Sequence, residues 1–279
     1  MISVIIPAHN EEKVIAAALR ELIAGVTNGE LEVIVVCNGC TDKTVELVAS
    51  FGSAIRCIET KVPSKSNALN LGDAVATSFP RFYQDADVVL SLDAIRQVAQ
   101  VLRAGLFLAA APRMHMDFRN ASWAVRAYYE VWRQLPYVRG GMIGVGVYAL
   151  SQDGRERFEK FPAIIADDRF IRALFKEHER TMVSACCSVV TAPATLRALL
   201  KIKTRSRLGG YQFEKKFSHL VDNEKKDYRS AIWNSIKIIK LWPALCVYLL
   251  VNLLCRSKAR WQLHHNLVDA WERDETSRS

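Results

Sequence analysis

The stretch Arg81-Phe82-Tyr83-Gln84-Asp85-Ala86-Asp87 places two carboxylates, with one residue between them, directly after a short strand. A helical segment is predicted to open near Ser91. Two ionised aspartates this close repel each other unless a cation lies beside them. Mg²⁺ and Mn²⁺ suit such oxygen ligands, and they bind through one or two carboxylates plus substrate phosphates. The alternative is a surface loop with two solvated aspartates. Features elsewhere in the sequence distinguish a metal site from such a loop.

Short apolar runs precede this stretch in the sequence. They predict buried strands over 3–6 and 31–37 and a third strand over 54–59. Helical segments are predicted between them, over 11–24, 44–50 and 66–77. Strands that alternate with helices indicate an α/β fold with a mostly parallel sheet covered by helices on both faces.

Polar side chains follow these predicted strands. In parallel sheets, ligands bind outside the carboxyl ends of the strands. The residues at those ends are His9, Asn10, Asn38, Asp42, Asp85 and Asp87. This coincidence favours a ligand site over two solvated aspartates. Asn10 is also predicted to cap the helix that begins at Glu11.

The middle of the chain adds further expected elements. A strand is predicted over 106–111, and a helix over 121–135 with Trp123 among its inward-facing residues. The glycine-rich stretch 140–146 is either a tight turn or a flexible loop that an acceptor approaches. Asp167-Asp168 precedes a predicted helix at 169–176. A helix cap needs only one of these two carboxylates, so the other is a candidate general base.

Composition places the basic character at one end of the chain. Of the 279 residues, 50% are hydrophobic and 24% are charged, which is typical of a globular protein. Residues 201–279 contain 16 Lys and Arg against 8 Asp and Glu, which accounts for +8 of the net charge of +9. This excess points to an anionic surface or ligand. We expect no nucleic-acid partner, because the tail carries no recognisable reading motif.

The seven cysteines indicate a reducing compartment, since the count is odd and the chain is too long for a disulfide scaffold. Cys37 and Cys40 form a C-x-x-C pattern, for which a redox pair is the alternative. The N-terminus has no basic region ahead of its apolar run, so we expect no signal peptide and a cytoplasmic location.

Five stretches together resemble the family 2 glycosyltransferases of the GT-A fold. The resemblance covers roughly residues 1–215 and implies a GT-A domain there. From its charge and its apolar run, the region 216–279 is expected to be a basic, partly apolar helical appendage. The matching stretches are Val4–Glu12, Asn38–Thr44, Lys65–Asn70, Asp85–Asp87 and Asp167-Asp168. Cys40 stands where the family often has Ser, which explains this cysteine better than a redox pair does.

The resemblance implies a role for each matching residue. Asp85 and Asp87 look like the site of a Mg²⁺ or Mn²⁺ ion and of the diphosphate sugar. Asp168 looks like the catalytic base, and Asp167 stands in place of the commoner Glu. The residues that look like the nucleotide-binding set are Pro7, His9, Asn10, Glu11, Asn38, Asp42 and Lys65. Ser64 replaces the glycine that usually precedes the lysine.

The implied reaction moves a sugar from a nucleotide-diphosphate sugar, expected to be a UDP-sugar, to a hydroxyl acceptor. One carboxylate base without a carboxylate nucleophile predicts a single displacement with inversion at the anomeric carbon. The expected setting is polysaccharide or glycolipid synthesis. The rival interpretations are a non-catalytic nucleotide-sugar-binding partner subunit and a sugar-phosphate nucleotidyltransferase.

The stretch Thr204–Gly210 replaces the Gln-x-x-Arg-Trp motif of processive family members, so a non-processive enzyme is expected. Arg205 and Arg207 are candidates for holding the diphosphate, because guanidinium groups suit phosphate oxygens. The alternative is a solvated basic loop.

The apolar run 241–255 is shorter than the ~20 residues needed to span a bilayer. It has Trp233, Trp242 and Trp261 near its ends, and basic residues follow it. Such flanks suit a helix that lies on an anionic membrane face, which would fit a lipid-linked acceptor and a peripheral location on the cytoplasmic membrane face. The alternative is a core helix that packs on the domain.

Overall fold

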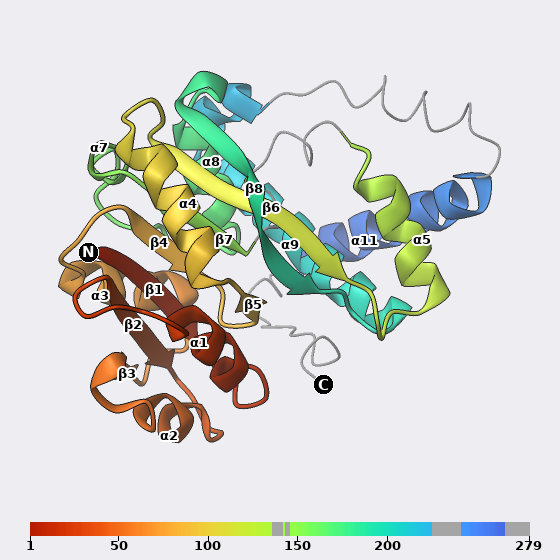
Figure 1. Ribbon diagram of the computed structural model, residues 1–279. Helices are drawn as coiled ribbons and strands as arrows, with labels where there is room; N and C mark the ends of the chain where they lie inside the picture. The colour runs from red at the N-terminus through yellow and green to blue at the C-terminus, as the bar shows by residue number, and fades with distance from the viewer. Residues whose placement is uncertain (136–141, 143–145, 225–240, 266–279) are drawn as a thin grey trace. The chain divides into compact units, whose positions relative to one another are not determined.

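The computed structural model describes residues 1–135, 142, 146–224 and 241–265 (Figure 1). The chain forms two compact units. The first unit contains Met1–His115, Gly144–Ala163 and Leu174–Val190, and the second contains Met116–Ile143, Ile164–Ala173 and Thr191–Ser279. The predicted boundary at 215/216 falls at the end of helix α9 (Leu196–Lys216), and the division made there stays a prediction.

An eight-stranded sheet in the order β3-β2-β1-β4-β7-β6-β8-β5 forms the core of the first unit. Strands β1 to β4 pair in parallel, which confirms the predicted α/β class. Strand β7 pairs antiparallel with both β4 and β6, and β5 pairs antiparallel with β8. The strands are β1 Ile2–Ala8, β2 Leu31–Asn38, β3 Arg56–Thr60, β4 Arg81–Gln84, β5 Val88–Val89, β6 Ala109–Asp117, β7 Val147–Leu150 and β8 Arg180–Thr191.

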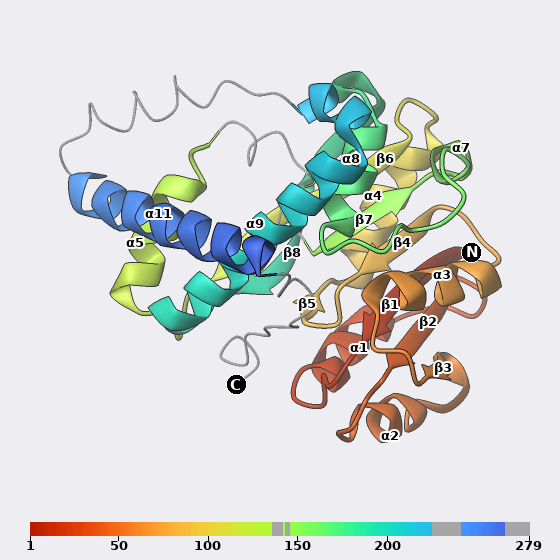
Figure 2. The same ribbon diagram turned by 180° about the vertical axis from the view of Figure 1, so that it is seen from behind.

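Strand β1 and most of β2 are buried, and both read as continuous apolar runs, whereas β3 at the edge of the sheet is only partly buried. Alternate residues of β1 serve opposite faces. Val4 and Ile6 belong to a core cluster that includes residues of α1 (Ile15–Ile23) and α4 (Leu92–Arg103). On the other face, α3 (Lys65–Val75) approaches β1 so closely that a Cβ on Gly72 would lie 2.5 Å from the Cγ2 of Ile5. Figures 1 and 2 show α1 and α4 on one side of the sheet and α3 on the other.

Three helices in the first unit begin with serine caps, as their sequences favour, and one of them is α7 (Gln152–Arg155), where Ser151 Oγ accepts from the backbone N–H of Gly154. Ser64 Oγ accepts a hydrogen bond from the backbone N–H of Asn67, and Ser91 Oγ accepts one from Ala94. The predicted helix start near Ser91 is therefore confirmed. The remaining helices are α2 Thr44–Ala49, α5 Trp123–Trp132, α8 Asp167–Leu174, α11 Trp242–His264, and the 3-10 turns η1 Gly52–Ala54, η2 Glu177–Glu179 and η3 Ser218–Glu224.

Several predicted details are wrong. Helix α1 begins at Ile15, so Asn10 is not its cap; Asn10 adopts a left-handed backbone conformation with φ 52°. The strand predicted over 106–111 runs over Ala109–Asp117 instead. Trp123, predicted to face inward, is 66% exposed. Most of the glycine-rich stretch 140–146, together with Trp233, lies outside the described residues.

Candidate functional site

The ends of β1 and β2 hold the first two polar loops together. The two strands run in parallel register, with Ala8 opposite Cys37, so the residues that follow them meet. The Nδ1 of His9 lies 2.5 Å from the carbonyl oxygen of Asn38. The Nδ2 of Asn38 donates to the carbonyl oxygen of Ala8 at 2.9 Å.

Asn38 keeps one buried acceptor unsatisfied. The residue is only 2% exposed, and its Nδ2 faces the carbonyl oxygens of Ala8 and Val36, which fixes the orientation of the amide. Its Oδ1 has no hydrogen-bond partner among the residues that the structure describes. A buried acceptor in this state costs about 1–3 kcal/mol, which a ligand N–H donor would recover.

Asn10 and Asp42 connect the two loops. The Oδ1 of Asn10 accepts from the backbone N–H of Thr41 at 2.7 Å. The carboxylate of Asp42 accepts from the backbone N–H of Glu12 and from both the N–H and the hydroxyl of Thr44. Burial raises the pKa of Asp42, but these hydrogen bonds outweigh it and leave the pKa below its usual value. Asp42 is therefore held as a fixed anion at the strand ends.

Asp85 and Asp87 directly follow β4, the parallel neighbour of β1. The backbone N–H of Asp85 donates to the carbonyl oxygen of Gly146 at 2.7 Å. Gly146 has φ 63°, and a Cβ there would overlap Val88. The Nζ of Lys65 lies 2.7 Å from the Oδ1 of Asp85, and the two side chains are 26% and 40% exposed.

These carboxylates suit a divalent ion that takes its other ligands from a phosphate. Within the described part of the chain, no three His, Cys, Asp or Glu side chains gather closely enough to hold a metal ion by themselves. Mg²⁺ and Mn²⁺ commonly bind through one or two carboxylates together with substrate phosphates. Asp85 and Asp87 supply that number of oxygen ligands, and the ammonium of Lys65 shows that Asp85 already faces a cation.

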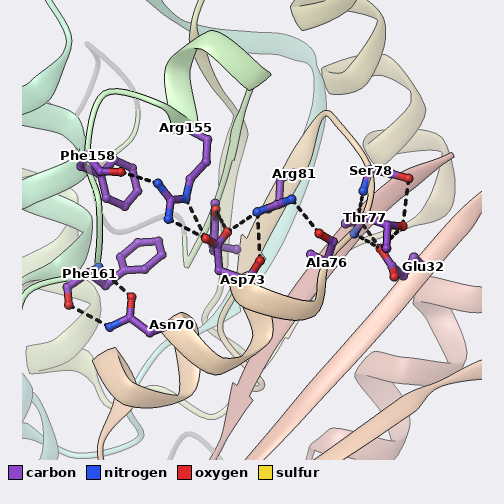
Figure 3. Close-up of polar contacts among 12 residues, drawn as sticks. Glu32, Asn70, Asp73, Ala76, Thr77, Ser78, Arg81, Arg155, Phe158 and Phe161 are labelled. Atoms are coloured by element: carbon purple, nitrogen blue, oxygen red, sulfur yellow. Dashed lines mark hydrogen bonds and ion pairs between the residues drawn. The ribbon is translucent and has the colours of Figure 1, made fainter.

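A buried polar network fixes helix α3 to the rest of the first unit (Figure 3). The amide of Asn70 makes two hydrogen bonds with the backbone of Phe161. One turn further, the carboxylate of Asp73 pairs with the guanidinium groups of Arg81 at 2.7 Å and Arg155 at 2.6 Å. Because Lys65 is the first residue of the same helix, this network also positions the partner of Asp85.

Asp73 and Arg155 are not among the residues predicted from the sequence. The available signal was helical spacing, since Asp73 lies three residues after Asn70, a residue already within a matching stretch. Arg155 had no signal of its own, because 82 residues separate it from Asp73.

In the second unit, Asp167 and Asp168 form part of the first turn of α8. The predicted start of this helix at Arg169 is thus two residues late. Asp167 is buried at 3% exposure, whereas Asp168 is exposed. The Oδ1 of Asp168 accepts from the backbone N–H of Arg169 at 2.7 Å.

The alternative of a basic loop at Thr204–Gly210 is wrong, because this stretch lies inside α9. Gly209 packs closely against the residues just before α8: a Cβ there would lie 3.0 Å from the Cβ of Ala166. Arg207 donates to the Oδ1 of Asn252 at 2.9 Å, so its guanidinium is fixed between α9 and α11. The contact of Arg205 and Arg207 with a diphosphate stays a prediction.

The predicted residues therefore fall into two groups. In the first unit, the structure brings together the loops that carry His9, Asn38 and Asp42, and it pairs Lys65 with Asp85. In the second unit, it places Asp168 on α8 and both arginines on α9.

Part of the sequence matches known proteins. A model of glycosyl transferase family 2 matches residues 3–147. The probable glycosyltransferase YdaM of Bacillus subtilis (strain 168) is 37% identical over 94 residues, which are 31% of this chain and 22% of that relative. This chain thus matches about a fifth of that curated relative's length.

Solved structures of low identity share the fold. A mannosyltransferase, PcManGT from Pyrobaculum calidifontis in complex with GDP-Man and Mn²⁺, superposes with a TM-score of 0.62 at 18% identity, over 97% of this chain and 80% of that chain. Glucosyl-3-phosphoglycerate synthase from Mycobacterium tuberculosis, in complex with Mn²⁺, UDP and phosphoglyceric acid, superposes with a TM-score of 0.55 at 17% identity. The match covers 77% of this chain and 78% of that chain.

Proposed function

The chain belongs to glycosyl transferase family 2 and has the GT-A fold, and we propose that it transfers a sugar from a nucleotide-diphosphate sugar to a hydroxyl acceptor. The observation that carries the proposal is the arrangement at the carboxyl ends of three neighbouring parallel strands. Loops held in place by His9, Asn38 and Asp42 follow two of them, and Asp85 and Asp87 follow the third.

The nucleotide would bind at the first two loops. The unsatisfied Oδ1 of Asn38 is suited to accept a hydrogen bond from a base N–H, such as the N3–H of uracil. We propose UDP as the nucleotide, and Pro7, His9, Asn10 and Glu11 as the remaining residues of this site. The complexes of the two fold relatives, one with GDP-Man and one with UDP, support a nucleotide ligand.

Asp87 and Asp85 would hold a Mg²⁺ or Mn²⁺ ion. When bound, such an ion acts as a Lewis acid that neutralises charge developing on the leaving diphosphate. Lys65 places a second positive charge 2.7 Å from Asp85 and would meet the same phosphates. The Mn²⁺ in the complexes of both fold relatives supports a divalent cofactor.

Asp168 is proposed as the general base. It would accept the proton of the acceptor hydroxyl as that oxygen attacks the anomeric carbon, while the bond from this carbon to the diphosphate breaks and its electron pair leaves on the phosphate oxygen. A single displacement of this kind inverts the anomeric configuration. The exposure of Asp168 beside the buried Asp167 favours Asp168 for this role.

We further propose that the acceptor belongs to polysaccharide or glycolipid synthesis and that it is lipid-linked. A lipid-linked acceptor presents its hydroxyl at a membrane surface. The basic C-terminal region, with 16 Lys and Arg against 8 Asp and Glu, supports this choice.

The substitution Asp168→Asn tests the proposal, with Mn²⁺- or Mg²⁺-dependent turnover measured across a panel of nucleotide sugars. Removing the base should lower turnover by about 10²–10⁴-fold and leave nucleotide binding unchanged. Asp93→Asn is the matched control, because Asp93 is also an exposed aspartate in the first turn of a helix. Turnover at the wild-type rate in Asp168→Asn would overturn the assignment.

A further inference from the structure

Helix α11 (Trp242–His264) has two faces of different character. One face packs within the second unit against α5 and α9. The ring of Tyr248 lies 5.1 Å from that of Tyr128, and the thiol of Cys255 donates to the carbonyl oxygen of Leu200. The buried residues of this face are Ala244, Leu245, Val251, Cys255, Ala259 and Gln262. The predicted alternative of a core helix thus describes one side of α11.

The opposite face carries exposed leucines. Residues four apart lie on the same side of a helix, so two overlapping pairs form a single stripe. Soluble proteins rarely expose such contiguous apolar surface without a partner. The members of this leucine stripe are Leu249 at 50%, Leu250 at 55%, Leu253 at 63% and Leu254 at 46% exposure.

Charge and aromatic residues frame the leucine stripe. Arg256, Lys258 and Arg260 follow it and are exposed, and no Asp or Glu occurs anywhere in α11. Trp242 and Trp261 lie near the two ends of the helix and are 53% and 55% exposed. Tryptophan and basic residues around an apolar face are typical of helices that lie at a membrane–water interface.

We propose that the leucine stripe of α11 docks on the surface of an anionic lipid bilayer, with the helix axis in the plane of the membrane. At 1.5 Å per residue, its 23 residues extend about 34 Å. Within the described ranges, no helix combines the length and apolar character needed to cross a bilayer. The leucines enter the acyl boundary while the cations meet lipid phosphates.

A second copy of the same face is the less suitable partner. Two copies of α11 would cover each other's leucines, but neither would bring a carboxylate to Arg256, Lys258 or Arg260. An anionic bilayer satisfies both the apolar and the charged part of the face. The proposal goes beyond the transfer activity and does not depend on it.

Flotation of the full chain with lipid vesicles tests the proposal. We expect binding to vesicles that contain phosphatidylglycerol and much weaker binding to pure phosphatidylcholine. The combined change of Leu249, Leu250, Leu253 and Leu254 to Ser should weaken binding by at least about tenfold, because each leucine loses its apolar contact with lipid. The charge variant R256Q/K258Q/R260Q should lose the preference for phosphatidylglycerol.

Leu106→Ser is the matched control, since Leu106 is 76% exposed on the first unit and should not affect flotation. Circular dichroism checks that the leucine variant remains helical. Equal flotation of wild type and the leucine variant would overturn the proposal. So would a dimer in light scattering that only the leucine variant disrupts, because a second copy would then be the partner. Asp168→Asn should float like wild type, which separates this test from that of the transfer reaction.

Discussion

The carboxylate of Asp73 is a buried charge on which we expect the stability of the first unit to depend. Its side chain is 7% exposed and accepts from the guanidinium of Arg81 at 2.7 Å and from the Nε of Arg155 at 2.8 Å (Figure 3). It also accepts from the hydroxyl of Tyr83 at 2.5 Å. Asp73→Asn keeps the shape of the side chain but removes its negative charge. The new amide also points an N–H₂ group at groups that are themselves donors. Two largely buried guanidinium groups would then lack their counter-charge.

The expected loss follows from these contacts. A hydrogen bond to a charged group contributes about 1.5–3 kcal/mol, and removing one partner of a buried ion pair costs about 3–5 kcal/mol. We therefore expect Asp73→Asn to lower the free energy of unfolding by about 3–5 kcal/mol and Tm by about 10 °C. Urea unfolding followed by circular dichroism measures this difference. Asp153→Asn, at an exposed position, is the control and should stay within about 0.5 kcal/mol of wild type.

The pH dependence gives a second check on the same residue. Burial raises the pKa of Asp73, but hydrogen bonds from Arg155, Tyr83 and Arg81 outweigh it and leave the pKa below its usual value. A lowered folded pKa stabilises the protein above the unfolded value of about 3.9, and this stabilisation is lost as the pH falls through the folded pKa. The gap in unfolding free energy between wild type and Asp73→Asn should be complete near about pH 6 and should shrink below about pH 4. A gap under about 1 kcal/mol at about pH 6, or one unchanged in acid, would refute the reasoning.

Two further predictions concern Asp85. Lys65→Met should strengthen Mn²⁺ binding without nucleotide by about two- to fivefold, because an ammonium no longer competes for the carboxylate, and should weaken nucleotide-sugar binding. Calorimetric titration measures both, with the exposed Lys61→Met as control; equal Mn²⁺ affinity would count against the competition. Gly146→Ala should weaken Mn²⁺ binding and cost more than about 1–2 kcal/mol of stability, since a Cβ there overlaps a neighbouring side chain at φ 63°. Gly52→Ala is the control, because Gly52 has φ 59° and open space around it, so this variant measures the cost of the backbone conformation alone. Equal losses of stability in the two variants would show that the overlap at Gly146 is harmless.

The parallel strands and the residues at their ends could be predicted because both signals are local. A buried parallel strand is a short apolar run, and the first polar residue after it marks the carboxyl end. The sequence alone therefore predicts that His9 and Asn38 lie near each other. It does not predict which atoms are left without partners, and the buried Oδ1 of Asn38 became visible only when its other hydrogen bonds were known.

Two of the wrong expectations, the loop at Thr204–Gly210 and the helix cap at Asn10, share a physical cause, which is that tertiary contacts override local preference. Gly209 and Gly210 favour a loop by intrinsic propensity. In the folded chain Gly209 lets α9 approach Ala166 closely, and the packing outweighs the helical cost of glycine. Asn10 has the chemistry of a helix cap but uses its side chain to hold Thr41 across the strand ends. The sequence does not show that Gly209 packs on Ala166 or that Asn10 binds Thr41, because both partners are distant along the chain.

Each unit fixes its own part of the proposed reaction by its own packing. Asp85 is held by backbone contact with Gly146 and by Lys65, whose helix the Asp73 network anchors. Asp168 and Arg169 both lie in the first turn of α8, and the guanidinium of Arg169 donates to the carbonyl oxygen of Gly210. Because these contacts share no residue, damage to leaving-group stabilisation and damage to proton removal should be separable. Substitutions in the Asp73 network should therefore affect nucleotide and metal affinity, whereas substitutions at the α8–α9 contact should act on turnover.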